Sequence, residues 1–385
     1  MGALMRSRIR VAFMAPLAAS LMLSGATGSA DSIRPIPAPV RLADAGSPLL
    51  ALAASRNTDL RPAAAHLLDL IDPAEGMSLR TEPGPSALAE LKRYFRLSPE
   101  LQLAMHDTVS GDLASAATAL QDRLESGWIR QISLPQNRLV IYYGNPFSAA
   151  LGPLGAYSDP ELVRRLRDQA AVYQRLDPAH PVVMGFDYVT PVAQPWPMSD
   201  GSWVSRMPSS SIQHYLDLAR ANHFLFFFDM ELGHSPINSE LDRLAPFLDE
   251  PEVGIALDPE FNMPKGAIPG RTFGRMSAAE INQALSRLST LVVSRDLPPK
   301  FVIIHQFLDS MLPDREAIRS YPGVTVIICV DGVGPAGSKI ADYRRFITPS
   351  KWLGGFKLFY RSDHPLMSEA AVLALRPAPV MVMYQ

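Results

Sequence analysis

The feature that most constrains the fold is a regular alternation of apolar runs and helical patterns from Arg138 to the end of the sequence. Each run is short, continuous and bounded by polar or turn residues. Runs that are apolar on both faces and separated by helices are typical of a parallel sheet covered on both sides. The expected strands are residues 139–143, 182–186, 224–228, 254–257, 301–304, 325–330, 356–359 and 380–383.

Helix-start signals stand between several of these runs. Ser158 precedes Asp-Pro-Glu, residues 209–221 form an amphipathic segment, and Ser277 with Glu280 forms a capping box ahead of a helix that runs to about residue 293. About eight strand–helix units predict an α/β fold of the (β/α)8 TIM-barrel type. A doubly wound open sheet is the alternative, but no glycine-rich dinucleotide turn follows the first run.

The first residues have the plan of a secretory signal. Arginines precede the apolar segment 11–23, and the small residues Gly28 and Ala30 follow it, which predicts a signal peptide over residues 1–30 with cleavage before Asp31. A membrane anchor is the alternative, but the apolar segment is short for a span of ~20 residues. We therefore expect a secreted, periplasmic or cell-surface protein without a stable membrane anchor after cleavage.

Three further regions follow the signal. Residues 31–97 are rich in proline and alanine and are expected to form an arm or linker. Residues 98–135 predict a mainly helical extension, and residues 136–385 are expected to form the barrel. The sequence ends directly after the last apolar run, so we expect the helical segment 98–126 to pack where the last barrel helix would lie.

Composition excludes some classes of function. The formal net charge is −2, and no basic run follows the N-terminus, so a nucleic-acid partner is not expected. A hydrophobic content of 47% supports a sizeable core. Cys329 is the only cysteine, which rules out an intramolecular disulfide, and its place in an apolar run predicts a small buried side chain. We expect a monomer that requires neither a cofactor nor a metal.

Two consecutive apolar runs end in pairs of carboxylates. Asp229 and Glu231 follow one run, and Asp258 and Glu260 follow the next. Barrel enzymes carry their chemistry at the carboxyl ends of the strands, and residues two apart on a strand face the same side. Glycoside hydrolysis uses two carboxyl groups about 5–9.5 Å apart, and neighbouring strands lie ~4.8 Å apart. These four residues are therefore the predicted catalytic groups.

Polar and aromatic residues follow the other runs in the same way. They form an unusually polar rim for strands with such apolar interiors, and tyrosine rings offer flat faces to sugars. We expect them to bind a saccharide or cell-wall glycan. The predicted substrate-binding residues are Tyr143, Asn145, Asp187, Tyr188, His305, Gln306, Asp331, Lys357 and Tyr384.

The motif Asp258-Pro-Glu260 resembles the D-x-E found at the same strand end in chitinase-like and muramidase-like barrel hydrolases. The resemblance implies that Glu260 is the acid and that Asp258 orients it or the substrate. The further upstream aspartates of the chitinase pattern are absent, because residues 254–256 are Gly-Ile-Ala. Substrate-assisted cleavage of an N-acetyl sugar is therefore in doubt.

The barrel region is also similar to a largely uncharacterised, actinobacterial-type group of secreted barrel proteins. The residues that carry this likeness are Leu257-Asp-Pro-Glu-Phe261, Ile268-Pro-Gly270 and His305-Gln-Phe307. The resemblance implies the fold and export, and it leaves the activity open.

Other functions remain open from the sequence. His305, Asp331, Asp229, Glu231 and His234 are candidate ligands in a metal-dependent hydrolase. That class is disfavoured because the His-x-His of amidohydrolase-like barrels and the His-Glu-x-x-His motif are both missing. Lys357 is a candidate for Schiff-base formation, although pairing with nearby carboxylates is its simpler role. A non-catalytic carbohydrate-binding or cell-surface barrel is the third class.

Overall fold

Eight parallel strands form a closed barrel in this computed structural model, which describes residues 128–347 and 351–385. The order around the barrel is β1-β10-β9-β8-β7-β6-β5-β2. The predicted runs and the predicted (β/α)8 TIM-type fold are confirmed. The strands are β1 (Arg138–Gly144), β2 (Val182–Val189), β5 (Leu225–Met230), β6 (Val253–Leu257), β7 (Lys300–Gln306), β8 (Val324–Val330), β9 (Leu353–Leu358) and β10 (Met381–Tyr384).

The barrel closes where β1 meets the last strand. Leu139 lies opposite Met381 of β10 on one side and opposite Val183 of β2 on the other. Because all these pairings are parallel, the carboxyl ends of the strands meet at one mouth. A polar residue that follows any strand is therefore delivered to the same rim.

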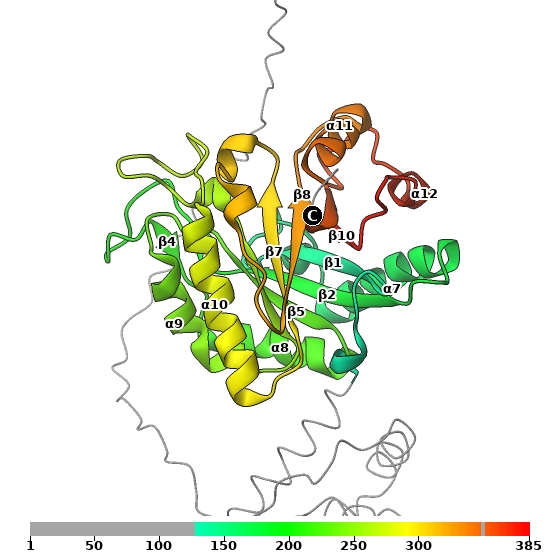
Figure 1. The fold of residues 1–385 in the computed structure, drawn as a ribbon, viewed down its shortest axis with the longest axis horizontal. Coiled ribbons are helices and arrows are strands. Elements are labelled where there is room, and N and C mark those ends of the chain that lie inside the picture. The colour runs from blue at the N-terminus through cyan, green and yellow to red at the C-terminus, as the bar shows by residue number, and fades with distance from the viewer. Residues whose placement is uncertain (1–127, 348–350) are drawn as a thin grey trace, which may run out of the picture. The chain divides into compact units, whose positions relative to one another are not determined.

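Helices cover most of the outside of the barrel (Figure 1). Ser158 occupies the N-cap position of α7 without a side-chain capping bond, and the capping box of Ser277 with Glu280 opens α10. These predicted starts and the predicted helix at residues 209–221 are confirmed. The helices are α6 (Pro153–Ala156), α7 (Asp159–Leu176), α8 (Ser209–Asn222), α9 (Ile237–Leu248), α10 (Ala278–Arg295), α11 (Ala336–Ile347) and α12 (Glu369–Leu373).

The outer ring of helices differs from eight full strand–helix units. Between β7 and β8 the structure has only the 3-10 turns η3 (Asp309–Met311) and η4 (Arg315–Ala317), and α12 is a single short turn. Pro313 and Pro322 lie in the connection between β7 and β8, and a proline inside a helix removes a hydrogen bond and clashes with the preceding turn. A long helix is therefore disfavoured there.

The two faces of the barrel wall have different partners. Alternate residues such as Phe226, Phe228 and Ile255 pack outward against the helices in one large apolar cluster. Phe227 of β5 faces the barrel interior, where Gly254 of β6 makes room for it: a Cβ at residue 254 would lie 2.8 Å from the Phe227 ring. The lower interior is therefore filled by apolar side chains, as in other barrels of this type.

Residues 1–127 lie outside the described part of the chain, and so do the predicted signal, the arm and most of the helical extension. Those assignments remain predictions. The described chain enters the barrel through the 3-10 turn η1 (Ile129–Gln131). Among the described residues, the helices are all too short or too polar to span a bilayer.

Candidate active site

Five polar or aromatic side chains close the top of the barrel interior. Each occupies an inward position near the carboxyl end of its strand, and each is buried. Asp229 stands two residues beyond Phe227, on the same face of β5, and the alternation of the other strands places their residues in the same way. The five are Tyr143 of β1, Asp187 of β2, Asp229 of β5, His305 of β7 and Lys357 of β9.

Four more carboxylates follow the strands at the mouth. Glu231, Asp258 and Asp331 are buried, whereas Glu260, in the 3-10 turn η2 (Pro259–Phe261), is partly exposed. Ala193 donates a backbone hydrogen bond of 2.8 Å to Glu231 Oε2 and fixes that side chain. We call the six carboxylates together the acid cluster: Asp187, Asp229, Glu231, Asp258, Glu260 and Asp331.

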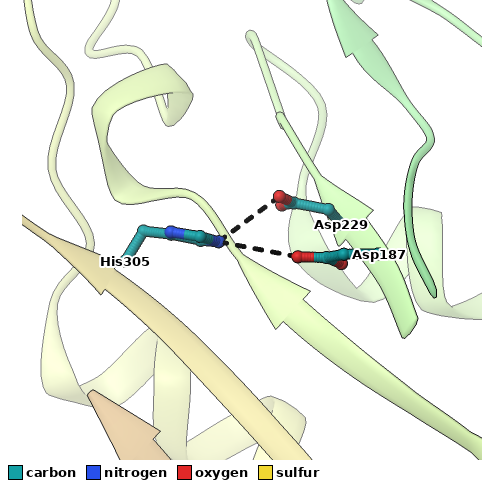
Figure 2. A group of neighbouring side chains, drawn as sticks. All are labelled: Asp187, Asp229 and His305. Atoms are coloured by element: carbon teal, nitrogen blue, oxygen red, sulfur yellow. Dashed lines mark ion pairs between the residues drawn. The ribbon is translucent and has the colours of Figure 1, made fainter. Parts of the chain in front are cut away.

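His305 lies between members of the acid cluster. Its Nδ1 is 3.1 Å from Asp331 Oδ2, and its Nε2 is 3.4 Å from Asp229 Oδ2 and 4.0 Å from Asp187 Oδ2 (Figure 2). These are ion-pair distances, without the alignment of hydrogen bonds. Burial lowers the pKa of His305, but Asp229 and Asp331 outweigh it and raise the pKa well above its usual value.

Lys357 is the second basic group of the interior. Its Nζ lies 3.6 Å from the centroid of the Tyr143 ring, an effective cation–π contact. Burial lowers the pKa of Lys357, yet Asp331 and Asp229 outweigh burial and raise it. Tyr143 is thus a support for the lysine, and its ring face is covered by the ammonium group.

The acid cluster carries more negative charge than its two basic neighbours balance. Burial raises the pKa of Asp258 to about 7, with His305 opposing the rise and Asp229 adding to it. Burial also raises the pKa of Glu260 well above its usual value, and the charges of Asp258 and Asp331 add to the effect. Crowded carboxylates in a low-dielectric interior retain protons near neutral pH for this reason.

The same two causes act on the remaining acids of the cluster. Burial, and then the charge of Asp258, raises the pKa of Glu231 well above its usual value. Burial and Asp229 do the same for Asp187. At Asp331 burial also acts to raise the pKa, but His305 outweighs it and holds the pKa below the usual value. The pKa values of neighbouring carboxyl groups are therefore shifted in opposite directions.

The ion pairs with His305 leave several carboxylate oxygens of the acid cluster without a hydrogen bond. Among the described residues, both oxygens of Asp187 and both of Asp229 lack a hydrogen-bond partner, as does one oxygen each of Asp258 and Asp331. Buried carboxylate oxygens are costly to leave unpaired. These oxygens can therefore bind a proton, a cation or the hydroxyl group of a substrate.

Three predicted substrate-binding residues face away from this interior, because neighbouring residues of a strand point to opposite sides. The Tyr188 hydroxyl bonds Ser211 Oγ of α8, and the Tyr384 hydroxyl bonds that of Tyr173 on α7. Gln306 accepts a bond from Arg315. These contacts hold the helices and loops on the barrel, so a substrate-binding role is not retained for Tyr188, Gln306 and Tyr384.

Asn145 has a structural role as well. Its amide donates to the Val189 carbonyl at 2.9 Å, and its side-chain oxygen accepts from the Phe147 backbone N–H at 2.9 Å. It therefore fixes the loop after β1 to the end of β2. A substrate-binding role is not retained for Asn145 either.

The arrangement of the candidate metal ligands differs from the set expected from the sequence. Asp187, Asp229 and His305 bring one donor atom each to within 4.8 Å of one another. His234 instead contacts the Ala267 carbonyl and the Trp203 ring in the loops. No spacing in the sequence predicts this group, because its members come from three different strands, β2, β5 and β7.

Loops that follow the strands surround the mouth. The loop after β2 contains the small hairpin β3 (Val192–Ala193) with β4 (Val204–Ser205), and it meets the loop after β5 through a bond from His234 N–H to the Ser202 carbonyl. Aromatic side chains stand exposed on these loops: Phe147 at 61%, Trp196 at 43% and Phe273 at 38%.

No family model and no curated protein matches the chain. Among solved structures, it is similar to an N-acetyl-beta-hexosaminidase from Streptomyces plicatus in complex with Thio-NAglucal, at 10% identity and a TM-score of 0.28 over 65% of this chain and 58% of that one. It is also similar to the GH20 beta-N-acetylhexosaminidase from Streptomyces coelicolor A3(2), at 11% identity and a TM-score of 0.29 over 65% and 59%. The chain spans less than two thirds of the length of either. These are distant structural similarities to glycoside-hydrolase barrels, and they do not assign catalytic residues or a substrate to this chain.

Proposed function

We propose that this barrel is an exported, glycoside hydrolase-like enzyme that acts on a polysaccharide or cell-wall glycan by carboxylate acid–base catalysis. Glu260 is the general acid in this proposal, and Asp258 orients it or the substrate. The observation that carries the proposal is the position of Glu260. Glu260 is a partly exposed residue at the mouth of the barrel, beside buried carboxylates.

A general acid for glycoside cleavage has two requirements. It must reach the leaving-group oxygen, and it must keep its proton at the working pH. The position of Glu260 at the mouth, where the residue keeps part of its surface in solvent, supports the first requirement. The burial of its carboxyl group and the charge of Asp258 raise its pKa and support the second. Asp229 and Glu231 remain the candidates for the second carboxylate that attacks or activates water.

The surface around the mouth supports a saccharide ligand. Phe147, Trp196 and Phe273 are exposed on the loops after β1, β2 and β6. Aromatic rings that keep one face in solvent provide flat apolar surfaces, and such surfaces suit the apolar faces of sugar rings. Loops at the carboxyl ends of barrel strands are where substrates bind in this fold.

The test is a saccharide panel assayed with the full chain, beginning with peptidoglycan and exopolysaccharide fragments and measuring new reducing ends. We expect Glu260→Gln to lower the rate by about 10²–10⁴-fold, because it keeps the shape and removes the proton donor. Saccharide binding should be retained. The matched control is Glu316→Gln on η4, whose side chain is 81% exposed, and it should leave the rate unchanged.

Other outcomes distinguish the alternative classes. Binding without release of reducing ends in the native protein would indicate a carbohydrate-binding barrel. Activity that is lost on chelation, is restored by a divalent ion and is indifferent to Glu260→Gln would indicate a metal-dependent hydrolase. Either result contradicts the acid–base proposal.

Export is the part of the proposal that rests on the N-terminal sequence alone. The arginines and the apolar segment 11–23 support it. N-terminal sequencing of the protein from a secreting host should begin at Asp31. Protein that keeps its first residues and stays in the cytoplasm would contradict export while leaving the catalytic proposal standing.

A further inference from the structure

Three fully buried side chains from three different strands point toward one another at the floor of the acid cluster (Figure 2). They are Asp187 of β2, Asp229 of β5 and His305 of β7. Their donor atoms lie within 4.8 Å of one another, and His305 Nε2 is 3.4 Å from Asp229 and 4.0 Å from Asp187. The strands hold these residues, so their spacing is set by the barrel rather than by mobile loops.

None of the facing atoms has a hydrogen-bond partner among the described residues. This holds for His305 Nε2 and for both oxygens of Asp187 and of Asp229. Two carboxylates side by side in a buried interior repel each other, and among the described residues the ion pairs with His305 Nε2 offset this repulsion. A cation bound between the three side chains would neutralise the repulsion more fully.

The other nitrogen of His305 faces a further carboxylate. Nδ1 lies 3.1 Å from Asp331 Oδ2, close enough that a small rotation of the ring would align an N–H with that oxygen. A histidine that ligates a metal commonly donates its second ring N–H to a carboxylate, which fixes the tautomer and directs the free lone pair at the ion. Asp331 is placed for that role, with Nε2 directed at Asp187 and Asp229.

The distances fit a small first-row metal ion. Its bonds to imidazole nitrogen and carboxylate oxygen are about 2.1 Å, so two ligands of one ion lie at most about 4.2 Å apart. The separations of 3.4 and 4.0 Å from His305 to the two aspartates meet that limit, and the separation between the donor atoms of the two aspartates is at most 4.8 Å. One imidazole with two carboxylates is a donor set suited to Zn²⁺ or Mn²⁺ rather than to Ca²⁺.

We propose that Asp187, Asp229 and His305 bind one divalent first-row metal ion, with Asp331 as the positioning residue behind His305. Three protein ligands leave at least one coordination position for water or for a substrate oxygen. The site uses neither Glu260 nor Asp258, but it includes Asp229, so an ion bound there would leave Glu231 as the candidate for the second carboxylate of the proposed function. Metal binding at this site can be measured without any substrate.

The test uses the untagged full chain, stripped with a chelator, dialysed, and then incubated separately with Mn²⁺, Zn²⁺, Mg²⁺ and Ca²⁺. Elemental analysis after removal of free ion should find one Mn²⁺ or Zn²⁺ per chain. Tm should rise with metal concentration, by roughly 5–10 °C at a hundredfold excess over Kd. A chain that retains none of the four ions, with Tm unchanged, would overturn the proposal.

Variants of the proposed ligands test where the metal ion binds. His305→Gln and Asp229→Asn should abolish stoichiometric binding, whereas Asp331→Asn should keep one ion and lose about 10–100-fold in affinity. Glu252→Gln is the matched control, because Glu252 is a buried carboxylate paired with Arg220 away from this group, and it should bind as the native protein does. Binding that survives in His305→Gln would contradict the assignment.

Co²⁺ loading of the native chain covers the case in which the variants fail to fold. Nitrogen and oxygen ligands predict weak visible bands without a thiolate charge-transfer band. A strong thiolate band would instead identify Cys329, which lies one strand away from His305 in β8, as a ligand, and it would overturn the proposed set.

Discussion

Asp258→Asn should stabilise the protein at neutral pH, because the acid cluster holds an ionised carboxylate where burial opposes it. Asp258 is buried, and one of its oxygens lacks a partner among the described residues. Its pKa rises from 3.8 to about 7 on folding, chiefly through burial, with Asp229 and Asp331 adding to the rise. The difference corresponds to ~4 kcal/mol of stability lost at pH 8, where Asp258 is ionised.

The sign follows from proton binding. Between pH 3.8 and about 7 the folded protein holds a proton that the unfolded chain has released, so the free energy of unfolding falls as the pH rises through that window. Because asparagine does not ionise, Asp258→Asn removes this fall in the free energy of unfolding. The variant should therefore exceed the native protein by ~4 kcal/mol at pH 8 and by less than ~2 kcal/mol at pH 5.

The assay is urea unfolding followed by tryptophan fluorescence at the two pH values, with a chelator present so that no bound cation alters the cluster. Asp363→Asn is the control of opposite sign, since the Asp363 carboxylate is buried but paired with Lys339 at 3.0 Å. It should destabilise the protein. An Asp258→Asn variant that is less stable than the native protein at pH 8, or equally stabilised at both pH values, would refute the reasoning.

Three further outcomes are expected. Lys339→Met should lower the free energy of unfolding by ~3–5 kcal/mol in the same urea assay, because it leaves the Asp363 carboxylate buried without its partner; an unchanged midpoint would contradict this. Trp196→Ala should raise KM on a polysaccharide about fivefold through the loss of ~1 kcal/mol of contact and leave kcat intact, which steady-state kinetics would check. Gly254→Ala should lower the free energy of unfolding by ~1–3 kcal/mol, because the added Cβ would lie 2.5 Å from a backbone oxygen of β7 and 2.8 Å from the Phe227 ring. A Tm equal to that of the native protein would show that the interior has room for the methyl group.

The barrel could be predicted because its strands are apolar on both faces. A strand such as β5 (Leu225–Met230) buries Phe226 against helices and Phe227 in the interior, so its sequence is a continuous apolar run. Helix starts that have their own capping residues could be predicted equally well. Ser277 and Glu280 satisfy each other's backbone donors within one turn, and no distant contact is needed.

The orientation of rim residues could not be predicted from the same pattern. When both faces of a strand are apolar, the sequence does not reveal which of two neighbours points inward. His305 and Gln306 illustrate this: both were predicted to bind substrate, yet His305 faces the acid cluster and Gln306 bonds Arg315 outside it. For the carboxylate pairs the same-face argument does not apply in full, because only Asp229 lies within a strand, whereas Glu231 and Asp258 follow β5 and β6 and Glu260 lies in the turn η2.

The connection between β7 and β8 failed to follow the expected strand–helix rhythm for a reason visible in its composition. Pro313 and Pro322 interrupt it, and the structure has 3-10 turns there. The grouping of Asp187, Asp229 and His305 had no local signal at all, since barrel closure creates it from strands far apart in the chain.

The most direct test of the central claim is the dependence of the Glu260→Gln rate on the leaving group of an aryl glycoside. A general acid matters most when the departing oxygen is basic, so we predict a loss of about 10²–10⁴-fold with a poor leaving group. With 2,4-dinitrophenolate, which departs without a proton, the loss should be less than about tenfold. Equal losses with both leaving groups, or no loss with either, would show that Glu260 is not the acid.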